Sequence, residues 1–179
     1  MSRPFVCLDR DGVINVDEVG YISDPADWEP LVGSAEAIGR LTQRNYDVFV
    51  LTNQSGIGRG YYTLDDMHAV HKKMRNVLSE FGGVVKAIYY CPHAPEERCG
   101  CRKPQTGMFE QLQYQFGVDL TQTWFVGDKL SDLLAGDAVN AQSVLVKTGC
   151  GVDTLVDLPG DHSYPVFDSL GAFVTHLLD

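Results

Sequence analysis

Long hydrophobic runs are missing from this sequence, and nothing in it reads as a signal peptide. No apolar stretch approaches the ~20 residues that a membrane-spanning helix requires. Positive charge is also scarce, because 14 Lys and Arg residues stand against 24 Asp and Glu residues, for a net charge of −10. This acidic excess disfavours nucleic acid and membranes as partners. We expect a cytoplasmic monomer whose partner is a small molecule.

Internal repeats and low-complexity tracts are absent as well, which disfavours solenoid and fibrous folds. The composition is instead that of an ordinary globular protein, with 44% hydrophobic and 21% charged residues. A length of 179 residues fits one domain better than two. We predict a single domain over residues 1–179.

Short apolar runs alternate along the chain with segments of helical periodicity. The apolar runs predict strands at residues 5–8, 48–51, 85–90, 124–126 and 143–146. The helical patterns cover residues 34–45, 63–81, 108–116, 131–140 and the stretch after 168. Apolar strands separated by helices are typical of a parallel sheet buried on both faces, because each parallel connection needs a crossover. The predicted fold class is α/β, a single doubly wound parallel-sheet domain without a separate cap domain.

Capping residues mark several of the predicted helix ends. Ser34 is expected to cap the first helix with its hydroxyl. Thr63, followed three residues later by Asp66, resembles a capping box. Gly82 and Gly117 are expected to end the helices that precede them, because glycine readily adopts the left-handed conformation found there.

Polar side chains follow four of the predicted strands. They are Asp9, Asp11, Thr52, Lys103 and Asp128. Ligands of such sheets bind beyond the carboxyl ends of the strands, so these side chains should meet in one crevice. A single Asp-x-Asp most often makes a turn, but gathered carboxylates repel one another unless a cation is present. Mg²⁺ would remove that repulsion, since it prefers carboxylate oxygens as ligands.

Three of the five cysteines lie close together beside a histidine, in a predicted zinc-binding loop at residues 91–101. The four candidate ligands are Cys91, His93, Cys99 and Cys101. Four such ligands match a closed tetrahedral Zn²⁺ site, which has no open position for water and is therefore structural. Because Cys101 directly precedes Arg102 and Lys103, zinc would fix the backbone that directs both cations into the crevice.

These motifs, in this order, resemble the four motifs of the haloacid dehalogenase superfamily of phosphatases. The resemblance covers residues 5–150 and rests on residues 9–13, Thr52, Lys103 and residues 127–132. It implies that Asp9 attacks phosphorus to form an aspartyl-phosphate, with Asp11 as general acid and then general base. Thr52 and Lys103 would hold the phosphoryl oxygens. Mg²⁺ would be bound by Asp9, Asp128 and the backbone carbonyl of Asp11, and Asp132 fits the second acidic position of the last motif.

The zinc loop narrows the resemblance to a branch that contains heptose-bisphosphate and histidinol-phosphate phosphatases. Residues 52–60 are similar to the heptose members, because the histidinol-phosphate members tend to carry an acidic residue where Ser55 stands. Arg59, Arg102 and Lys129 supply more positive charge than one phosphoryl group needs, which favours a second anion. The residues expected to contact substrate are Asp17, Glu18, Gly20, Asn53, Gln54, Ser55, Arg59, Arg102 and Lys129.

We therefore expect a Mg²⁺-dependent phosphatase that removes the C7 phosphate of a sugar phosphate, D-glycero-D-manno-heptose 1,7-bisphosphate. Histidinol phosphate is the alternative substrate. A phospho-receiver domain also gathers Asp, Thr and Lys at strand ends, but it needs neither Asp11 nor the zinc loop. A zinc-binding interaction module would leave the aspartates without a purpose. A kinase is disfavoured because residues 56–60 lack the spacing of a nucleotide-binding P-loop.

Overall fold

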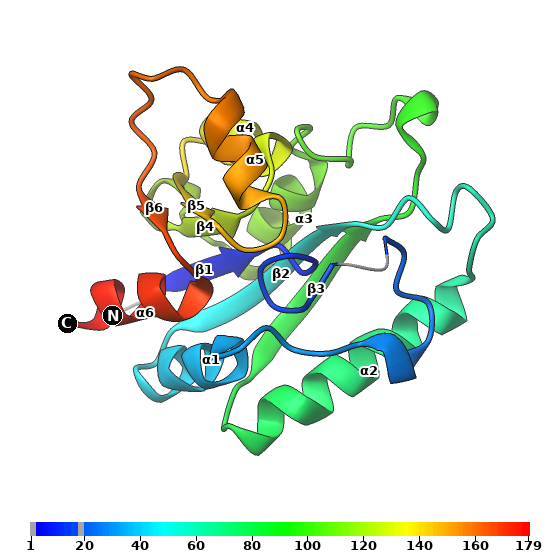
Figure 1. Cartoon of the computed structure of the whole chain (residues 1–179), viewed down its shortest axis with the longest axis horizontal. Coiled ribbons are helices and arrows are strands. Elements are labelled where there is room, and N and C mark those ends of the chain that lie inside the picture. The colour runs from blue at the N-terminus through cyan, green and yellow to red at the C-terminus, as the bar shows by residue number, and fades with distance from the viewer. Residues whose placement is uncertain (1–2, 18–19) are drawn as a thin grey trace.

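A twisted sheet of six parallel strands runs through the centre of the molecule (Figure 1). The structure is a computed structural model and describes residues 3–17 and 20–179. The strands are β1 Phe5–Leu8, β2 Asp47–Asn53, β3 Val85–Cys91, β4 Trp124–Gly127, β5 Gln142–Val146 and β6 Val166–Phe167. Their order in the sheet is β3-β2-β1-β4-β5-β6. The predicted fold class is confirmed, and the two-residue strand β6 adds an edge that the sequence patterns did not predict.

Six α-helices connect and follow these strands. They are α1 Ser34–Gln43, α2 Leu64–Glu80, α3 Gly107–Phe116, α4 Leu130–Ala138, α5 Gly151–Asp157 and α6 Leu170–Leu178. Three short 3₁₀ turns lie in the loops, η1 Pro25–Asp27, η2 Pro95–Glu97 and η3 Leu120–Gln122. Each predicted helix is present, whereas α5 was not predicted. The seven residues of α5 make a segment too short to give a clear helical period.

Helices cover both faces of the sheet, as the continuous apolar strands require. Alternate residues of β1 divide between two cores, with Val6 and Leu8 in one and Cys7 in the other. The first core packs against α1, α2 and α6, and the second against α3 and α4 (Figure 1). The result is three layers, with the sheet in the middle.

The helix ends follow the capping signals with one exception. Thr63 accepts a hydrogen bond from the backbone N–H of Asp66 and Asp66 accepts one from that of Thr63, so the predicted capping box is confirmed. Gly117 ends α3 with a φ of +63°. The prediction for Ser34 was wrong, because Gly33 is the N-cap of α1. The buried Ser34 hydroxyl instead donates to the carbonyl of Ile14 at 2.6 Å, which ties α1 to the loop after β1.

The strand order reverses between β1 and β4. The connection from β1 runs toward the β3 edge of the sheet, and the connection from β4 runs toward the β6 edge. This divergence opens a crevice beyond the carboxyl ends of β1 and β4. No cap domain is evident in the part of the chain that the structure describes, since the loop between β1 and α1 contains only η1. The crevice is therefore covered by loops.

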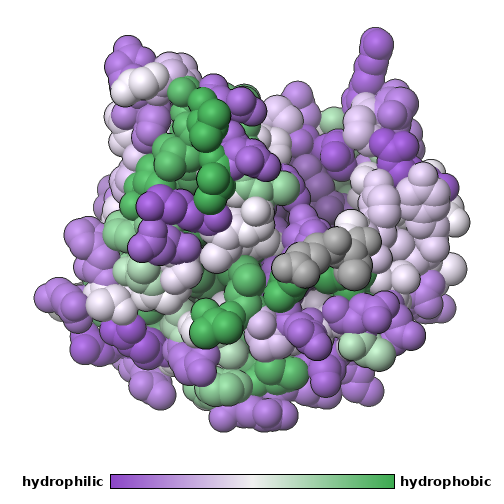
Figure 2. All heavy atoms as spheres, viewed as in Figure 1, coloured by the Kyte–Doolittle hydropathy of each residue, from purple (hydrophilic) through white to green (hydrophobic). Residues whose placement is uncertain are grey.

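One patch of apolar surface lies over α5. Green residues gather over α5 in the space-filling view (Figure 2), where Val152 and Val156 are 55% and 78% exposed. Among the described residues, no helix is both long enough and apolar enough to cross a membrane.

Candidate active site

A cavity of about 350 Å³ lies beyond the carboxyl ends of β1, β2 and β4. Most of its lining residues are polar or charged, and they come from four segments of the chain. The lining residues are Asp9, Arg10, Asp11, Asp17, Gly20, Tyr21, Ile22, Asn53, Gln54, Ser55, Tyr62, Arg102, Lys103, Lys129, Ser131 and Asp132. Thr52 and Asp128 are buried behind this wall. The sequence therefore brings its polar strand ends together in one place, as the topology of the sheet predicts.

Lys103 is the central cation of the cavity. Its Nζ lies 2.9 Å from a carboxylate oxygen of Asp9 and 2.7 Å from one of Asp132, and it donates to the carbonyl of Leu51 at 2.7 Å. Burial alone would lower the pKa of Lys103, but the two carboxylates outweigh burial and raise it. Lys103 is therefore held as an ammonium group directly beside Asp9.

Asp9, Asp128 and Asp132 form a buried carboxylate cluster, with one oxygen of each lying within 4.8 Å of the others. Burial is the chief cause that raises the pKa of Asp9 to about 6 and that of Asp128 to about 7. One oxygen of Asp128 accepts from the N–H of Cys150 at 2.7 Å. Its other oxygen, Oδ1, is buried and has no hydrogen-bond partner among the described residues.

This arrangement fits a hard divalent cation. A buried carboxylate oxygen without a donor is costly, and paired carboxylates disfavour charge on each other. A cation bound between Asp9 and Asp128 would remove both penalties, and Mg²⁺ prefers oxygen ligands. Asp132 is already engaged, because its Oδ2 accepts from the N–H groups of Asp128 and Lys129 while Oδ1 faces Lys103.

Asp11 accepts hydrogen bonds from three side chains. The buried Arg10 guanidinium donates to both of its oxygens, Asn15 donates at 3.0 Å and Gln54 at 2.8 Å. Burial would raise the pKa of Asp11, but the Arg10 charge and these hydrogen bonds outweigh burial and lower it. The other side of Arg10 contacts His71 of α2, with 3.1 Å between Nη1 and Nε2. Asp11 is thus set as a carboxylate at the cavity wall.

The end of β2 carries three polar residues with separate contacts. The Gln54 amide nitrogen donates to Thr52 Oγ1 at 2.8 Å, and its oxygen accepts from the Tyr62 hydroxyl at 2.6 Å. The Asn53 side chain makes two hydrogen bonds with the backbone of Lys103, at 3.0 and 3.2 Å. Asn53 therefore fixes the position of the loop that carries the central cation.

Two further cations line the cavity. Lys129 forms an ion pair with Asp17 at 3.1 Å, and its pKa is raised because Asp128, Asp9 and Asp17 outweigh burial. Arg102 has a buried guanidinium nitrogen, Nη1, that has no hydrogen-bond partner in the described part of the chain. Together with Lys103 these groups provide positive charge for more than one anion.

The cysteine loop forms a compact ligand set. Sγ of Cys99 lies 3.5 Å from that of Cys91 and 3.6 Å from that of Cys101, and His93 Nδ1 lies 3.6 and 3.3 Å from Cys91 and Cys101. A tetrahedral ion with bonds of about 2.3 Å to sulfur and 2.0 Å to nitrogen separates its ligand atoms by about 3.5–3.8 Å. The four side chains therefore fit a closed zinc site without rearrangement.

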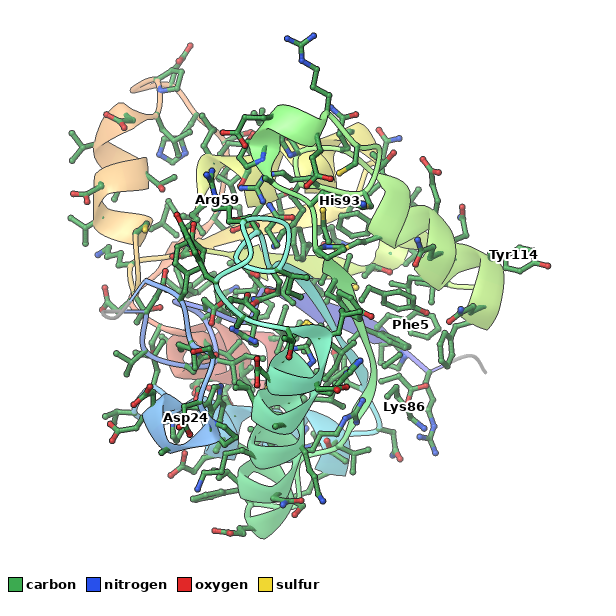
Figure 3. The ribbon with its side chains drawn as sticks, turned by 90° about the vertical axis from the view of Figure 1, so that its right-hand side faces the viewer. Phe5, Asp24, Arg59, Lys86, His93 and Tyr114 are labelled. Carbon is green, nitrogen blue, oxygen red and sulfur yellow. The ribbon has the colours of Figure 1, made fainter. Side chains whose placement is uncertain are left out.

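The loop after β2 packs against this cysteine loop. The N–H of Gly58 donates to the carbonyl of Pro92 at 2.8 Å, and a Cβ at position 58 would come within 2.6–2.9 Å of Glu97, Ala94 and Pro92. Arg59 forms an ion pair with Glu96 at 3.4 Å and does not line the cavity. Figure 3 shows Arg59 and His93 at the same end of the molecule.

The comparisons with known proteins agree with this geometry. Residues 100–173 match a family model described as HAD-hydrolase-like. The chain is 50% identical over 178 residues to a D-glycero-beta-D-manno-heptose-1,7-bisphosphate 7-phosphatase of Pseudomonas aeruginosa, covering 99% of both proteins. A relative of the same name from Neisseria meningitidis is 42% identical over 177 residues and covers 97% of this chain and 94% of its own.

A solved structure matches over nearly the whole length. It is a D,D-heptose 1,7-bisphosphate phosphatase from B. bronchiseptica complexed with magnesium and phosphate, with a TM-score of 0.92, 41% identity and 98% coverage of both chains. The chain belongs to the heptose-bisphosphate phosphatase family of the haloacid dehalogenase superfamily. It is a phosphoric monoester hydrolase.

Within this family member, the structure brings together most of the residues singled out from the sequence. Those that line the cavity are Asp9, Asp11, Asp17, Gly20, Asn53, Gln54, Ser55, Arg102, Lys103 and Lys129. Thr52 and Asp128 lie behind them, and the four cysteine-loop ligands form their own cluster. Arg59 lies outside the cavity lining, and Glu18 falls outside the described residues.

Sequence reasoning missed several residues of the site. Arg10 lies inside a motif that had been recognised, but a buried arginine between two aspartates is indistinguishable from an exposed one in a sequence. His71 is 61 positions away from Arg10, so nothing local indicates that they touch. Tyr21 and Tyr62 also border the cavity, and their rings lie 6.4 Å apart.

Proposed function

We propose that this chain hydrolyses the C7 phosphate of D-glycero-beta-D-manno-heptose 1,7-bisphosphate and leaves the 1-phosphate in place. The observation that carries the substrate is the 50% identity with the Pseudomonas aeruginosa 7-phosphatase over 178 residues. The β anomer follows the two relatives, which act on it according to their names. The cations of the cavity wall support a substrate with two phosphates.

Asp9 is the proposed nucleophile. Its Oδ1 accepts from the N–H of Arg10 at 2.8 Å and faces Lys103, which leaves Oδ2 without a hydrogen bond to any described residue. An oxygen of Asp9 attacks phosphorus, and the bond between phosphorus and the C7 oxygen breaks. Water then attacks the aspartyl-phosphate, which releases inorganic phosphate and restores the Asp9 carboxylate.

Asp11 is the proposed general acid and base. It gives a proton to the departing C7 oxygen and takes one from the attacking water in the second step. Because its donors hold it as a carboxylate, Asp11 has to lose part of this set of hydrogen bonds and take up a proton from solvent before it can act as the acid. The proton that it takes from the attacking water then restores the acid form. The hydroxyl of Thr52 and the ammonium group of Lys103 would hold the phosphoryl oxygens.

Two metal ions complete the proposed enzyme. Asp9, Asp128 and the backbone carbonyl of Asp11 would hold Mg²⁺, which would neutralise charge on the carboxylates and on the phosphoryl group. Asp132 would position Lys103 rather than bind the metal, since both of its oxygens are already engaged. The cluster of Cys91, His93, Cys99 and Cys101 would hold Zn²⁺ as a structural ion.

Arg102 and Lys129 are the proposed contacts for the second phosphate. They lie on the cavity wall near Lys103, and Arg102 has a buried guanidinium nitrogen still without a partner in the described residues. Histidinol phosphate would place a cationic amine in this positively charged region, so it should be a poor substrate. The roles of Asp17, Gly20, Asn53, Gln54 and Ser55 as substrate contacts are proposed from their positions on the wall.

The test is a phosphate-release screen with Mg²⁺ over heptose 1,7-bisphosphate, histidinol phosphate and fructose 1,6-bisphosphate. We expect the heptose substrate to have the highest kcat/KM, and ³¹P NMR to show that the 1-phosphate remains. A preference for histidinol phosphate would refute the substrate assignment.

Replacing Arg102 by alanine tests the second phosphate site. Loss of one charge-assisted contact predicts a roughly ten- to hundredfold lower kcat/KM for the bisphosphate, with little change for p-nitrophenyl phosphate. Arg98→Ala is the matched control, because Arg98 is an exposed arginine of the same loop that does not line the cavity. Equal losses on both substrates in Arg102→Ala would contradict this role.

A further inference from the structure

A second cavity lies between α2 and β3, outside the active site. It has a volume of about 370 Å³, within the usual range for small-ligand pockets. Its lining residues are His68, His71, Lys72, Arg75, Ile88 and Tyr90. Every polar side chain among them can donate a hydrogen bond, and none is a carboxylate.

Two cations of this cavity have no acidic partner. In the part of the chain that the structure describes, no carboxylate oxygen lies within 4.0 Å of Lys72 or Arg75. Arg75 donates through one nitrogen to the carbonyl of Val85, which leaves the rest of its guanidinium group available. In a chain with a net charge of −10, two adjacent uncompensated cations favour a bound anion.

His71 contributes a buried donor whose orientation is fixed. The residue is 5% exposed, and its Nε2 lies 3.1 Å from Nη1 of Arg10. A guanidinium group only donates, so Nε2 must accept and the ring proton must lie on Nδ1. No described residue accepts a hydrogen bond from Nδ1, and the ring borders the cavity.

We propose that this cavity binds a small oxyanion of the phosphate class through Lys72, Arg75 and the Nδ1–H of His71. Arg10 then connects the bound anion to the active site, because it contacts His71 on one side and donates to Asp11 at 2.8 and 2.9 Å on the other. The proposed anion site is therefore linked to the proposed general acid and base by two side-chain contacts. This inference does not depend on which sugar phosphate the enzyme hydrolyses.

The experiment is an NMR titration of zinc-loaded protein labelled with ¹⁵N, in Mg²⁺-free buffer. Removing Mg²⁺ weakens binding of phosphate beside the carboxylates of the crevice. Phosphate that still binds to Arg102 and Lys129 there is distinguished from phosphate in the second cavity by the α2 variants. The titrants are inorganic phosphate and methylphosphonate, each compared with NaCl at equal ionic strength. We expect saturable shifts of the ring nitrogens of His68 and His71, together with a shift of the Nε–H of Arg10.

Variants of α2 identify the site. Lys72→Gln with Arg75→Gln should weaken binding at least tenfold, whereas Lys73→Gln on the same helix should bind as the parent does. Replacing Arg75 also removes its hydrogen bond to the carbonyl of Val85, which could disturb folding. The single variant Lys72→Gln keeps that hydrogen bond and should still weaken anion binding. Equal shifts with NaCl, or equal weakening by Lys73→Gln, would overturn the anion site. Saturation without any shift at Arg10 would overturn the link to Asp11.

Discussion

His71 should make the folded protein sensitive to acid. Its pKa is lowered from 6.5 to about 3, first by burial and then by the adjacent Arg10 charge. For a base with a depressed pKa in the folded state, the unfolded chain binds the proton more tightly. Stability is therefore fully present above about pH 6.5 and is lost as the pH falls toward 3.

The size of this effect follows from the two pKa values. At pH 5 the unfolded histidine is largely protonated and the folded one is not, and the gap of roughly 1.5 pH units corresponds to about 2 kcal/mol. We expect His71→Gln to remove this loss, because the amide oxygen of glutamine can still accept from Arg10 but the side chain does not titrate.

Urea unfolding of both proteins at pH 7.5, 6 and 5 measures the effect. The difference between the two unfolding free energies should shift in favour of His71→Gln by about 2 kcal/mol between pH 7.5 and 5, since carboxylates titrate in both proteins and cancel. His68→Gln is the control for the substitution itself, because His68 is an exposed histidine one turn away on the same helix. Parallel pH profiles for parent and His71→Gln would refute the reasoning.

Three further predictions concern the proposed catalytic machinery. Asp9→Asn should abolish phosphate release in a folded protein, because an amide cannot attack phosphorus, and normal turnover would rule out the covalent mechanism. Brief EDTA treatment should stop turnover until Mg²⁺ is added, while metal analysis should find about one zinc per chain still bound. Cys101→Ser should lose that zinc and have lower activity in kinetic assays. Gly149→Ala should raise the Mg²⁺ concentration needed for half-maximal rate at least tenfold, because a Cβ there would come within 2.3 Å of Asp128 Oδ2; unchanged Mg²⁺ dependence would contradict this.

The sequence carried the layout of the fold because each buried strand has its own local signal. The apolar run at residues 48–51, for example, became the centre of β2, and Thr52 was correctly placed at its end. Strand β6 was missed because two residues give no period. Ser34 was assigned the wrong role because a serine at the start of a helical pattern predicts an N-cap whatever its hydroxyl contacts in the fold. Here the hydroxyl donates to the carbonyl of Ile14, which lies 20 residues away in the sequence.

The motif residues of the site were predictable from the sequence, whereas contacts between distant elements were not. Motif residues at strand ends converge because parallel topology places them at one edge, which requires no knowledge of side-chain packing. The partner of Arg10 could not be found in this way, because its contact with His71 depends on how α2 packs against the sheet. Arg59 follows a motif segment closely, yet its ion pair with Glu96 directs it to another loop.

The hydrogen bond from Gly58 to Pro92 has a consequence for chemical vulnerability. It joins the loop after β2 to the cysteine loop, so the positions of both loops depend on the same four proposed zinc ligands. Cys99 and Cys101 are partly exposed, and a thiol oxidant or alkylating reagent can therefore reach them without entering the cavity. Their modification would release the proposed zinc ion and loosen both loops while the carboxylates of the cavity stay intact. Inactivation by such reagents would consequently leave the proposed Mg²⁺ ligands unaltered, and added zinc with a reductant would reverse the oxidative form of the damage.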